Sequence, residues 1–103
     1  MGLTIQEIRN NINNARYLYY RTRTQKFAVG AFNIDNQETL IAVARAAQKM
    51  RSPVLVEVSN GEAKAIGLDN IRDMVNNYKS EYGIEMYLNL DHGPTVEDCK
   101  KAI

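Results

Sequence analysis

Three short apolar segments, each separated from the next by a stretch with helical spacing, constrain the fold most strongly. The segments are KFAVGAFNID (26–35), VLVEVS (54–59) and IEMYLNL (84–90), and their apolar and β-branched residues are typical of buried strands. Between them, apolar residues recur every three or four positions, as on one face of a helix. Strands that alternate with helices of this size predict right-handed β-α-β units, a parallel sheet and the α/β class.

Capping patterns predict where the helices begin. Thr4 and Glu7 have the spacing of a capping box ahead of a first helix. Asp35 and Glu38 have the same spacing and predict a second helix that ends near residue 50. Asp69 is expected to cap a third helix, which Gly83 terminates. The segment NGEAKAIG (60–67) between these helices is expected to be a turn or one loose helical segment.

Each of the three predicted strands ends in a polar side chain. Asn33 ends the first, Ser59 the second, and Asp91 with His92 the third. Parallel β/α folds bind their ligands at the C-terminal ends of the strands. Because three consecutive parallel strands end at one edge of the sheet, these four residues are predicted to form one candidate site.

Each candidate residue also has a structural interpretation that the pattern leaves open. Asn33 and Ser59 are common residues for starting turns and capping helices, and Asp91 is able to cap the turn that follows it. His92 is the only histidine of the chain, and one imidazole does not make a zinc site, which needs three or four ligands.

Composition excludes few functions. The chain has 103 residues and a formal charge of +1, which fits one modest domain and gives no whole-chain argument for an acidic partner. The start lacks a signal-peptide pattern and no apolar stretch is long enough to span a bilayer, so a cytoplasmic protein without membrane contacts is expected. Cys99 is the only cysteine and lies on the apolar side of a last helix capped by Thr95, which favours core packing over a reactive role.

The segment RYLYYRTRTQK (16–26) mixes basic and aromatic residues, which is one pattern of RNA-binding surfaces. It also continues the first helix, and a solvated face with long side chains lying along the surface is the preferred interpretation. No nucleic-acid partner is therefore expected. Glu57 interrupts an apolar strand and is expected to be paired or to point toward the candidate site.

From Phe27 onward the sequence resembles the N-terminal portion of the class II, zinc-dependent fructose-bisphosphate aldolases, together with their relatives that act on tagatose bisphosphate. The resemblance rests on VGAFN (29–33), on the strand PVLVEVS (53–59), and on Asp-His-Gly at 91–93, in this order and spacing. It implies a TIM (β/α)8 barrel, a fold that needs about 250 residues. Residues 1–103 are thus expected to be an incomplete domain with about three of the eight strands.

The resemblance also assigns roles. It implies that Asp91 is the catalytic acid/base, that His92 is one of the Zn²⁺ ligands, and that Asn33 and Ser59 contact the substrate. The implied reaction is the reversible cleavage of a ketose 1,6-bisphosphate to glycerone phosphate and glyceraldehyde 3-phosphate. Glu57 stands where the family commonly has an amide and Pro94 where it usually has a small hydroxyl residue, which indicates a divergent branch and leaves fructose and tagatose both open.

Three functional hypotheses follow from the sequence. The first is a class II aldolase whose remaining zinc ligands lie outside this chain, acting as a homo-oligomer or with a complementing chain. The second is a catalytically inactive barrel fragment that serves as an interaction or assembly partner through its open sheet edges. The third, least favoured, is a small RNA-binding domain that uses residues 16–26.

Overall fold

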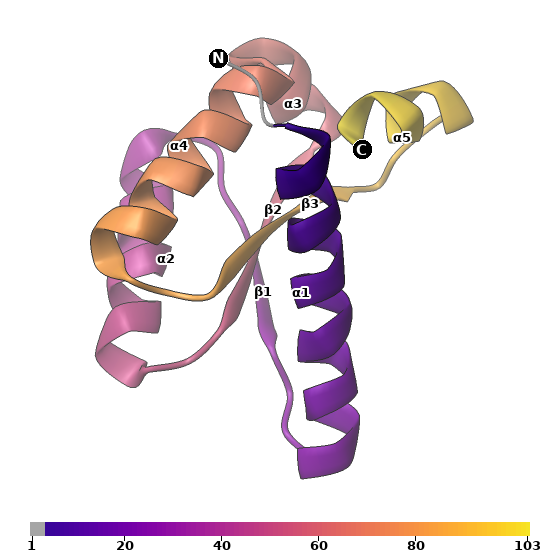
Figure 1. Cartoon of the computed structure of the whole chain (residues 1–103). Coiled ribbons are helices and arrows are strands. Elements are labelled where there is room, and N and C mark those ends of the chain that lie inside the picture. Colours follow the sequence, from indigo (N-terminus) through magenta and orange to yellow (C-terminus); the bar gives the residue numbers. More distant parts are fainter. Residues whose placement is uncertain (1–3) are drawn as a thin grey trace.

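The computed structural model describes residues 4–103 and has the predicted α/β architecture. Figure 1 shows the elements, which follow along the chain as α1 (Ile5–Gln25), β1 (Gly30–Asn33), α2 (Gln37–Met50), β2 (Val54–Ser59), α3 (Asn60–Ile66), α4 (Leu68–Tyr82), β3 (Met86–Asp91) and α5 (Val96–Ala102). The alternation of strands and helices is therefore confirmed. The segment at 60–67, expected as a turn or a loose helical segment, forms the short helix α3.

The three strands form one parallel sheet in the order β1-β2-β3. β2 lies in the centre, with Asn33 of β1 opposite Glu57 and Asp91 of β3 opposite Ser59. Because all three strands run in the same direction, their C-terminal ends lie at the same edge of the sheet, as the sequence predicts.

Side chains along β2 point alternately to the two faces of the sheet, and this alternation determines which face packs in the core. Val54, Val56 and Val58 are buried, whereas the residues between them are partly exposed. The buried face packs against α2 and α4, which lie side by side at the left of Figure 1. Leu40 of α2 and Ile71 of α4 are fully buried there. The opposite face of the sheet therefore keeps its polar side chains accessible.

α1 lies at the right of Figure 1. Its N-terminal half lines a groove together with α4, β3 and the end of α5, and its C-terminal half is attached near the start of β3. Its buried residue is Leu18, and Arg21 Nη2 donates to Glu85 Oε1 at 2.5 Å, an oxygen that also accepts from the Tyr87 hydroxyl at 2.9 Å. The hydrogen bond to Glu85 raises the pKa of Arg21, while burial together with the same carboxylate raises that of Tyr87. One polar cluster thus joins the helix to the sheet.

Two predicted helix caps are wrong. Asn36, not Asp35, caps α2, because its backbone is still extended and its side chain accepts from the backbone N–H of Thr39. α4 begins directly after Gly67 and has no side-chain cap. Asp69 instead lies in its first turn and pairs with Arg72 at 2.9 Å. The Thr4–Glu7 capping box of α1 is present as predicted.

The first strand is shorter than predicted. α1 ends at Gln25, and its C-cap Lys26, expected as the first strand residue, has a left-handed conformation (φ 55°). Regular pairing begins only at Gly30. A Cβ there would lie 2.6 Å from the end of the Phe32 ring, so any side chain at this position would displace that half-exposed ring.

The prediction that Cys99 packs in the core is wrong. Cys99 is exposed, and α5 has no buried residue. Val96 and Ile103 of the same predicted apolar side are largely exposed as well. The helical spacing is as predicted, but none of the elements within residues 4–103 covers that side of α5.

Within residues 4–103, no helix combines the length and the apolar character that crossing a bilayer requires.

Replacing Ile71 by Ala should lower the free energy of unfolding by about 2–5 kcal/mol, because it removes a fully buried side chain from the α4–sheet interface. Ile5→Ala is the matched control: this isoleucine is also helical but 70% exposed, so the change should stay within about 0.5 kcal/mol. Urea denaturation of the two variants measures both values. Equal losses would contradict the placement of the core.

Candidate functional site

The structure brings Asn33 and Asp91 together at the C-terminal edge of the sheet. The amide Nδ2 of Asn33 donates to Asp91 Oδ2 at 3.1 Å, across the central strand that separates β1 from β3. Asp91 is also the register partner of Ser59. The prediction that these three residues share one edge is confirmed, and the amide holds the carboxylate on the open side of the sheet.

Ser59 has a structural role that the sequence left open. It is the N-cap of α3, and its Oγ accepts from the backbone N–H of Glu62 at 3.4 Å. A hydroxyl that accepts one hydrogen bond still has its own proton to donate. The side chain can therefore cap the helix and contact a ligand at the sheet edge at the same time.

His92 follows the last residue of β3 and adopts a left-handed conformation with φ 56°. Its side chain is 90% exposed, and Nε2 lies 3.8 Å from Asp91 Oδ1, too far for a hydrogen bond. Because the backbone turns sharply between the two residues, the imidazole extends into solvent while the carboxylate stays with Asn33. Within residues 4–103, neither imidazole nitrogen forms a hydrogen bond, so the ring is accessible to a ligand.

The described residues contain no cluster of three or more His, Cys, Asp or Glu side chains that would hold a metal ion. His92 fits one position of a zinc site through its accessible imidazole. A zinc ion bound here would need at least two further ligands besides those of this edge.

The turn after β3 lies against α5. A Cβ added at Gly93 would be 2.5 Å from Cys99 Sγ, so only glycine fits here without a shift of the thiol. Thr95 caps α5 as predicted, accepting from the backbone N–H of Asp98 at 3.0 Å. The loop that presents His92 is therefore fixed at both of its ends.

Glu57 and Asn89 form a second amide–carboxylate pair that the sequence reasoning only half found. Asn89 Nδ2 donates to Glu57 Oε2 at 2.5 Å, so the expected pairing of Glu57 is confirmed. Asn89 was not singled out, although its spacing of two residues from Asp91 on one strand places both on the same face. The accessible face of the sheet thus has two carboxylates, each with an amide donor.

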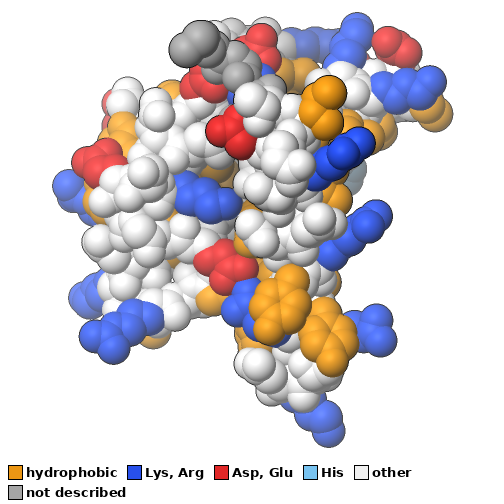
Figure 2. Space-filling view, viewed as in Figure 1, with side chains coloured by type: hydrophobic (Ala, Val, Ile, Leu, Met, Phe, Trp, Pro, Cys, Tyr) orange, Lys and Arg blue, Asp and Glu red, His pale blue; other side chains and the backbone are white. Residues whose placement is uncertain are grey.

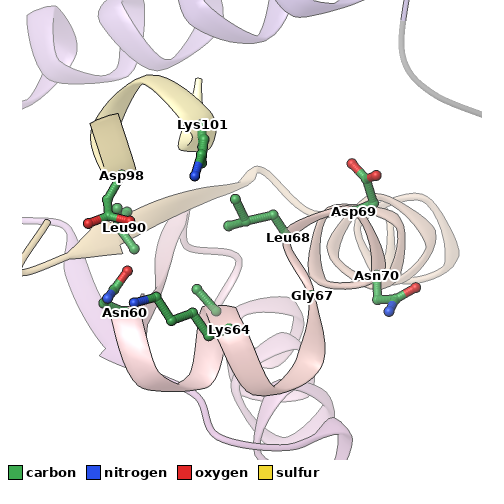
Figure 3. A pocket seen from close by; sticks show the side chains of 10 residues that line it. Asn60, Lys64, Gly67, Leu68, Asp69, Asn70, Leu90, Asp98 and Lys101 are labelled. Atoms are coloured by element: carbon green, nitrogen blue, oxygen red, sulfur yellow. The ribbon is translucent and has the colours of Figure 1, made fainter. Parts of the chain in front are cut away.

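The cavity in Figure 3 is separate from this edge. It has a volume of about 650 Å³ and lies between α3 and α5, with Asn60 and Lys64 on one wall and Asp98 and Lys101 on the other. None of the four predicted site residues lines it. The candidate site is therefore an open sheet edge, and the half-open cavity between α3 and α5 lies beside it.

Similar solved structures are aldolases. The YdjI aldolase from Escherichia coli K12 matches with a TM-score of 0.74 and 24% identity, over 84% of this chain and 34% of that chain. The fructose-bisphosphate aldolase from Campylobacter jejuni matches with a TM-score of 0.70 and 27% identity, over 75% of this chain and 26% of that chain. This chain thus spans about a third or a quarter of the length of either structure.

The fold is that of the N-terminal part of an aldolase (β/α) barrel. The sequence matches the family "Fructose-bisphosphate aldolase class-II" over residues 13–103. The chain therefore belongs to the class II fructose-bisphosphate aldolase family, and the resemblance seen in the sequence is confirmed.

A double-mutant cycle on Asn33→Ala and Asp91→Ala should give a coupling of about 0.5–1.5 kcal/mol in unfolding free energy, because the two side chains share a partly exposed hydrogen bond. A second cycle pairs Asp91→Ala with Asn77→Ala, which removes an exposed amide from α4. That control should be additive within about 0.3–0.5 kcal/mol. Additivity in the first cycle would show that the Asn33–Asp91 contact does not form in solution.

Proposed function

We propose that residues 1–103 form the N-terminal segment of a class II aldolase barrel and supply part of its active site. The reaction is the zinc-dependent, reversible cleavage of a ketose 1,6-bisphosphate, either fructose or tagatose bisphosphate, to glycerone phosphate and glyceraldehyde 3-phosphate. Asp91 is the acid/base, His92 is a zinc ligand, and Asn33 and Ser59 contact the substrate. As a family enzyme of central sugar chemistry it would act in the cytoplasm, as a homo-oligomer or with a complementing chain.

The observation that carries the proposal is the edge formed by the Asn33–Asp91 pair, with His92 next in the chain, in a member of this family. Consecutive residues at a strand end can serve two different partners because the left-handed turn at His92 separates their side chains. The carboxylate can then face a substrate hydroxyl while the imidazole faces a metal ion.

Asp91 must handle a proton for this chemistry. In cleavage its carboxylate takes the proton of the C4 hydroxyl as the C3–C4 bond breaks, and in condensation it returns that proton to the new hydroxyl. The Asn33 amide orients the carboxylate through the 3.1 Å hydrogen bond and leaves the other oxygen free. Zinc, when bound, supplies Lewis-acid stabilisation of the negative charge that develops on the substrate.

The charges of the accessible sheet face limit how the substrate lies. This face has the carboxylates of Glu57 and Asp91, and the strand positions that share it contain no lysine or arginine. Phosphate groups bind to cationic side chains, backbone N–H groups or metal ions. The substrate's hydroxyl-bearing carbons should therefore lie over this edge, and its phosphates should be held elsewhere.

A second candidate function is that of an assembly partner without catalysis of its own. Within residues 4–103, β1 and β3 each pair with β2 on one side only. Unpaired strand edges are ready to accept a further strand from another segment or chain. This alternative shares the fold with the enzyme proposal and differs from it in not needing Asp91 or His92.

The 103-residue chain alone should show little or no aldolase activity, because its one histidine cannot hold zinc without further ligands. The measurement is cleavage of fructose and tagatose bisphosphate with added Zn²⁺, followed through the glycerone phosphate released. Sustained turnover by a chain verified by mass, in preparations free of host aldolase, would contradict the ligand argument.

In a complete barrel that contains this segment, replacing Asp91 and replacing His92 should have different effects on zinc content and turnover. Asp91→Ala should keep its zinc but lower turnover by about 10²–10⁴, the usual range for a lost acid/base. His92→Ala should lose zinc content and turnover together. Metal analysis and cleavage rates on the same preparations separate the two.

Proton exchange on isolated glycerone phosphate provides a further distinction. This exchange does not involve the C4 hydroxyl, so Asp91→Ala should impair it less than it impairs cleavage. Asp98→Ala is the matched control and should keep near-normal cleavage; it removes a carboxylate in the first turn of α5 that accepts from the Thr95 hydroxyl. A folded Asp91→Ala barrel with normal zinc and near-normal cleavage would contradict the role assigned to Asp91.

A further inference from the structure

Positive charge is concentrated in α1 and the segment that follows it. Between Glu7 and Asp35 the sequence contains no Asp or Glu, and it has five basic residues: Arg9, Arg16, Arg21, Arg23 and Lys26. Because the whole chain carries +1 and this segment +5, the rest of the chain carries −4. The net charge of the whole chain is therefore close to zero although α1 is strongly basic.

Three of these arginines form a regular row. Arg9, Arg16 and Arg23 are seven residues apart, which on a helix places them on one face at intervals of about 10.5 Å. All three are exposed, and none forms an ion pair within residues 4–103. Arg21, by contrast, points to the sheet and is held by Glu85. The row is thus free to bind an anionic partner.

Exposed tyrosines accompany this row. Tyr17, Tyr19 and Tyr20 are 59%, 51% and 59% exposed. The rings of Tyr17 and Tyr20 are stacked, with centroids 6.2 Å apart and planes at 19°. In Figure 2, Lys/Arg and hydrophobic side chains, the class that includes tyrosine, lie together over the lower half of α1.

This side of α1 is solvated, as the sequence predicts, and the side that faces the protein is occupied by Leu18. One long side chain lies along the surface: the Arg21 guanidinium is 5.1 Å from the centroid of the Tyr17 ring. The sequence does not predict that three tyrosine rings are more than half exposed beside the arginines. We call the six exposed residues the arginine–tyrosine face, namely Arg9, Arg16, Tyr17, Tyr19, Tyr20 and Arg23.

We propose that the arginine–tyrosine face of α1 binds single-stranded nucleic acid. Proteins that bind single strands combine cationic side chains that follow the phosphates with aromatic rings on which bases stack. Tyr20 lies four residues after Arg16 and three before Arg23, so a ring is placed between two cations on the same face. Arg23 lies 14 residues after Arg9, so the row is about 21 Å long, enough for several nucleotides.

A membrane surface fits this face less well. Amphipathic helices that bind membranes insert an apolar face, with their cations on the other side. In α1 the buried Leu18 and the half-buried Ile8 and Ala15 face the protein, while Arg9, Arg16, Arg23 and the tyrosines share the outer side. The exposed apolar side chains of α1 are two isoleucines, Ile5 and Ile12, which do not form a continuous apolar face. Flat, solvent-exposed rings between cations match nucleobases and phosphates instead.

The test uses the 103-residue chain and fluorescein-labelled 12-nucleotide probes of uridine, adenosine and thymidine, with fluorescence anisotropy as the readout. The probes should bind, and binding should weaken with salt with a log–log slope of about −2, as expected for three phosphate contacts on a single strand. The triple variant Arg9→Gln, Arg16→Gln, Arg23→Gln should abolish most of this slope. Tyr19→Ala with Tyr20→Ala should weaken binding roughly 10-fold or more at constant slope.

Two controls isolate the face. Arg45→Gln removes an exposed arginine from α2, and Tyr82→Ala removes one ring of the other stacked tyrosine pair, in α4. Both should bind like the unchanged chain. Circular dichroism checks folding, and if the triple variant is unfolded, the single variant Arg16→Gln should still reduce the slope by about 0.7.

Several results would overturn the proposal. The first is no binding of the probes at micromolar protein concentration in low salt. The second is a loss of affinity in the Arg45 and Tyr82 controls equal to that in the variants of the face. The third is an unchanged salt-dependence slope in a folded triple variant. Vesicles of phosphatidylserine and phosphatidylcholine form the last arm, and tighter binding to them than to the oligonucleotides would assign the face to a membrane. Catalysis is not measured, so the result is independent of the proposed aldolase function.

Discussion

The parallel pairing of β2 with both of its neighbours is the constraint on which the rest of the structure depends. It fixes Ser59 opposite Asp91 and Glu57 opposite both Asn33 and Asn89. Because side chains alternate along a strand, this register places the valines of β2 toward α2 and α4 and all the polar partners on the other face. A shift of one residue would bury Glu57 and expose the valines, so the hydrophobic core and the candidate site are determined together.

Polar contacts determine how the outer parts are attached to this sheet. α1 has only one fully buried side chain, Leu18, and its position depends also on the cluster of Arg21, Glu85 and Tyr87 at the start of β3. The partly buried hydroxyl of Tyr87 has a raised pKa, so it remains a hydrogen-bond donor over the whole physiological range. The attachment of α1 is therefore directional, and it leaves the opposite side of the helix fully accessible.

The sequence predicts the class of the fold and the sheet edge shared by Asn33, Ser59 and Asp91. Both depend on the spacing of apolar residues and on the order of the strands, to which many residues contribute. Helix boundaries follow less well, since a single side-chain contact decides them. Asp35 and Asn36 are both good capping residues, and only the backbone conformation selects Asn36. The burial of Cys99 could not be predicted for a different reason. Helical spacing predicts which side of α5 is apolar, but not whether another element covers that side. The chemistry implied for Asp91 and His92 comes from family membership, because neither residue spacing nor backbone geometry indicates it.

The distribution of charge relates the two functional surfaces to each other. The strand positions of the accessible sheet face carry two carboxylates and no cation, whereas Arg9, Arg16 and Arg23 of α1 face outward. The arginine–tyrosine face belongs to α1, and the four residues of the candidate site lie at the ends of the three strands, so each surface can be changed without replacing a residue of the other. Exposed charges are screened over about 10 Å at ordinary ionic strength, so any effect of the α1 arginines on the Asp91 edge should weaken as salt is added.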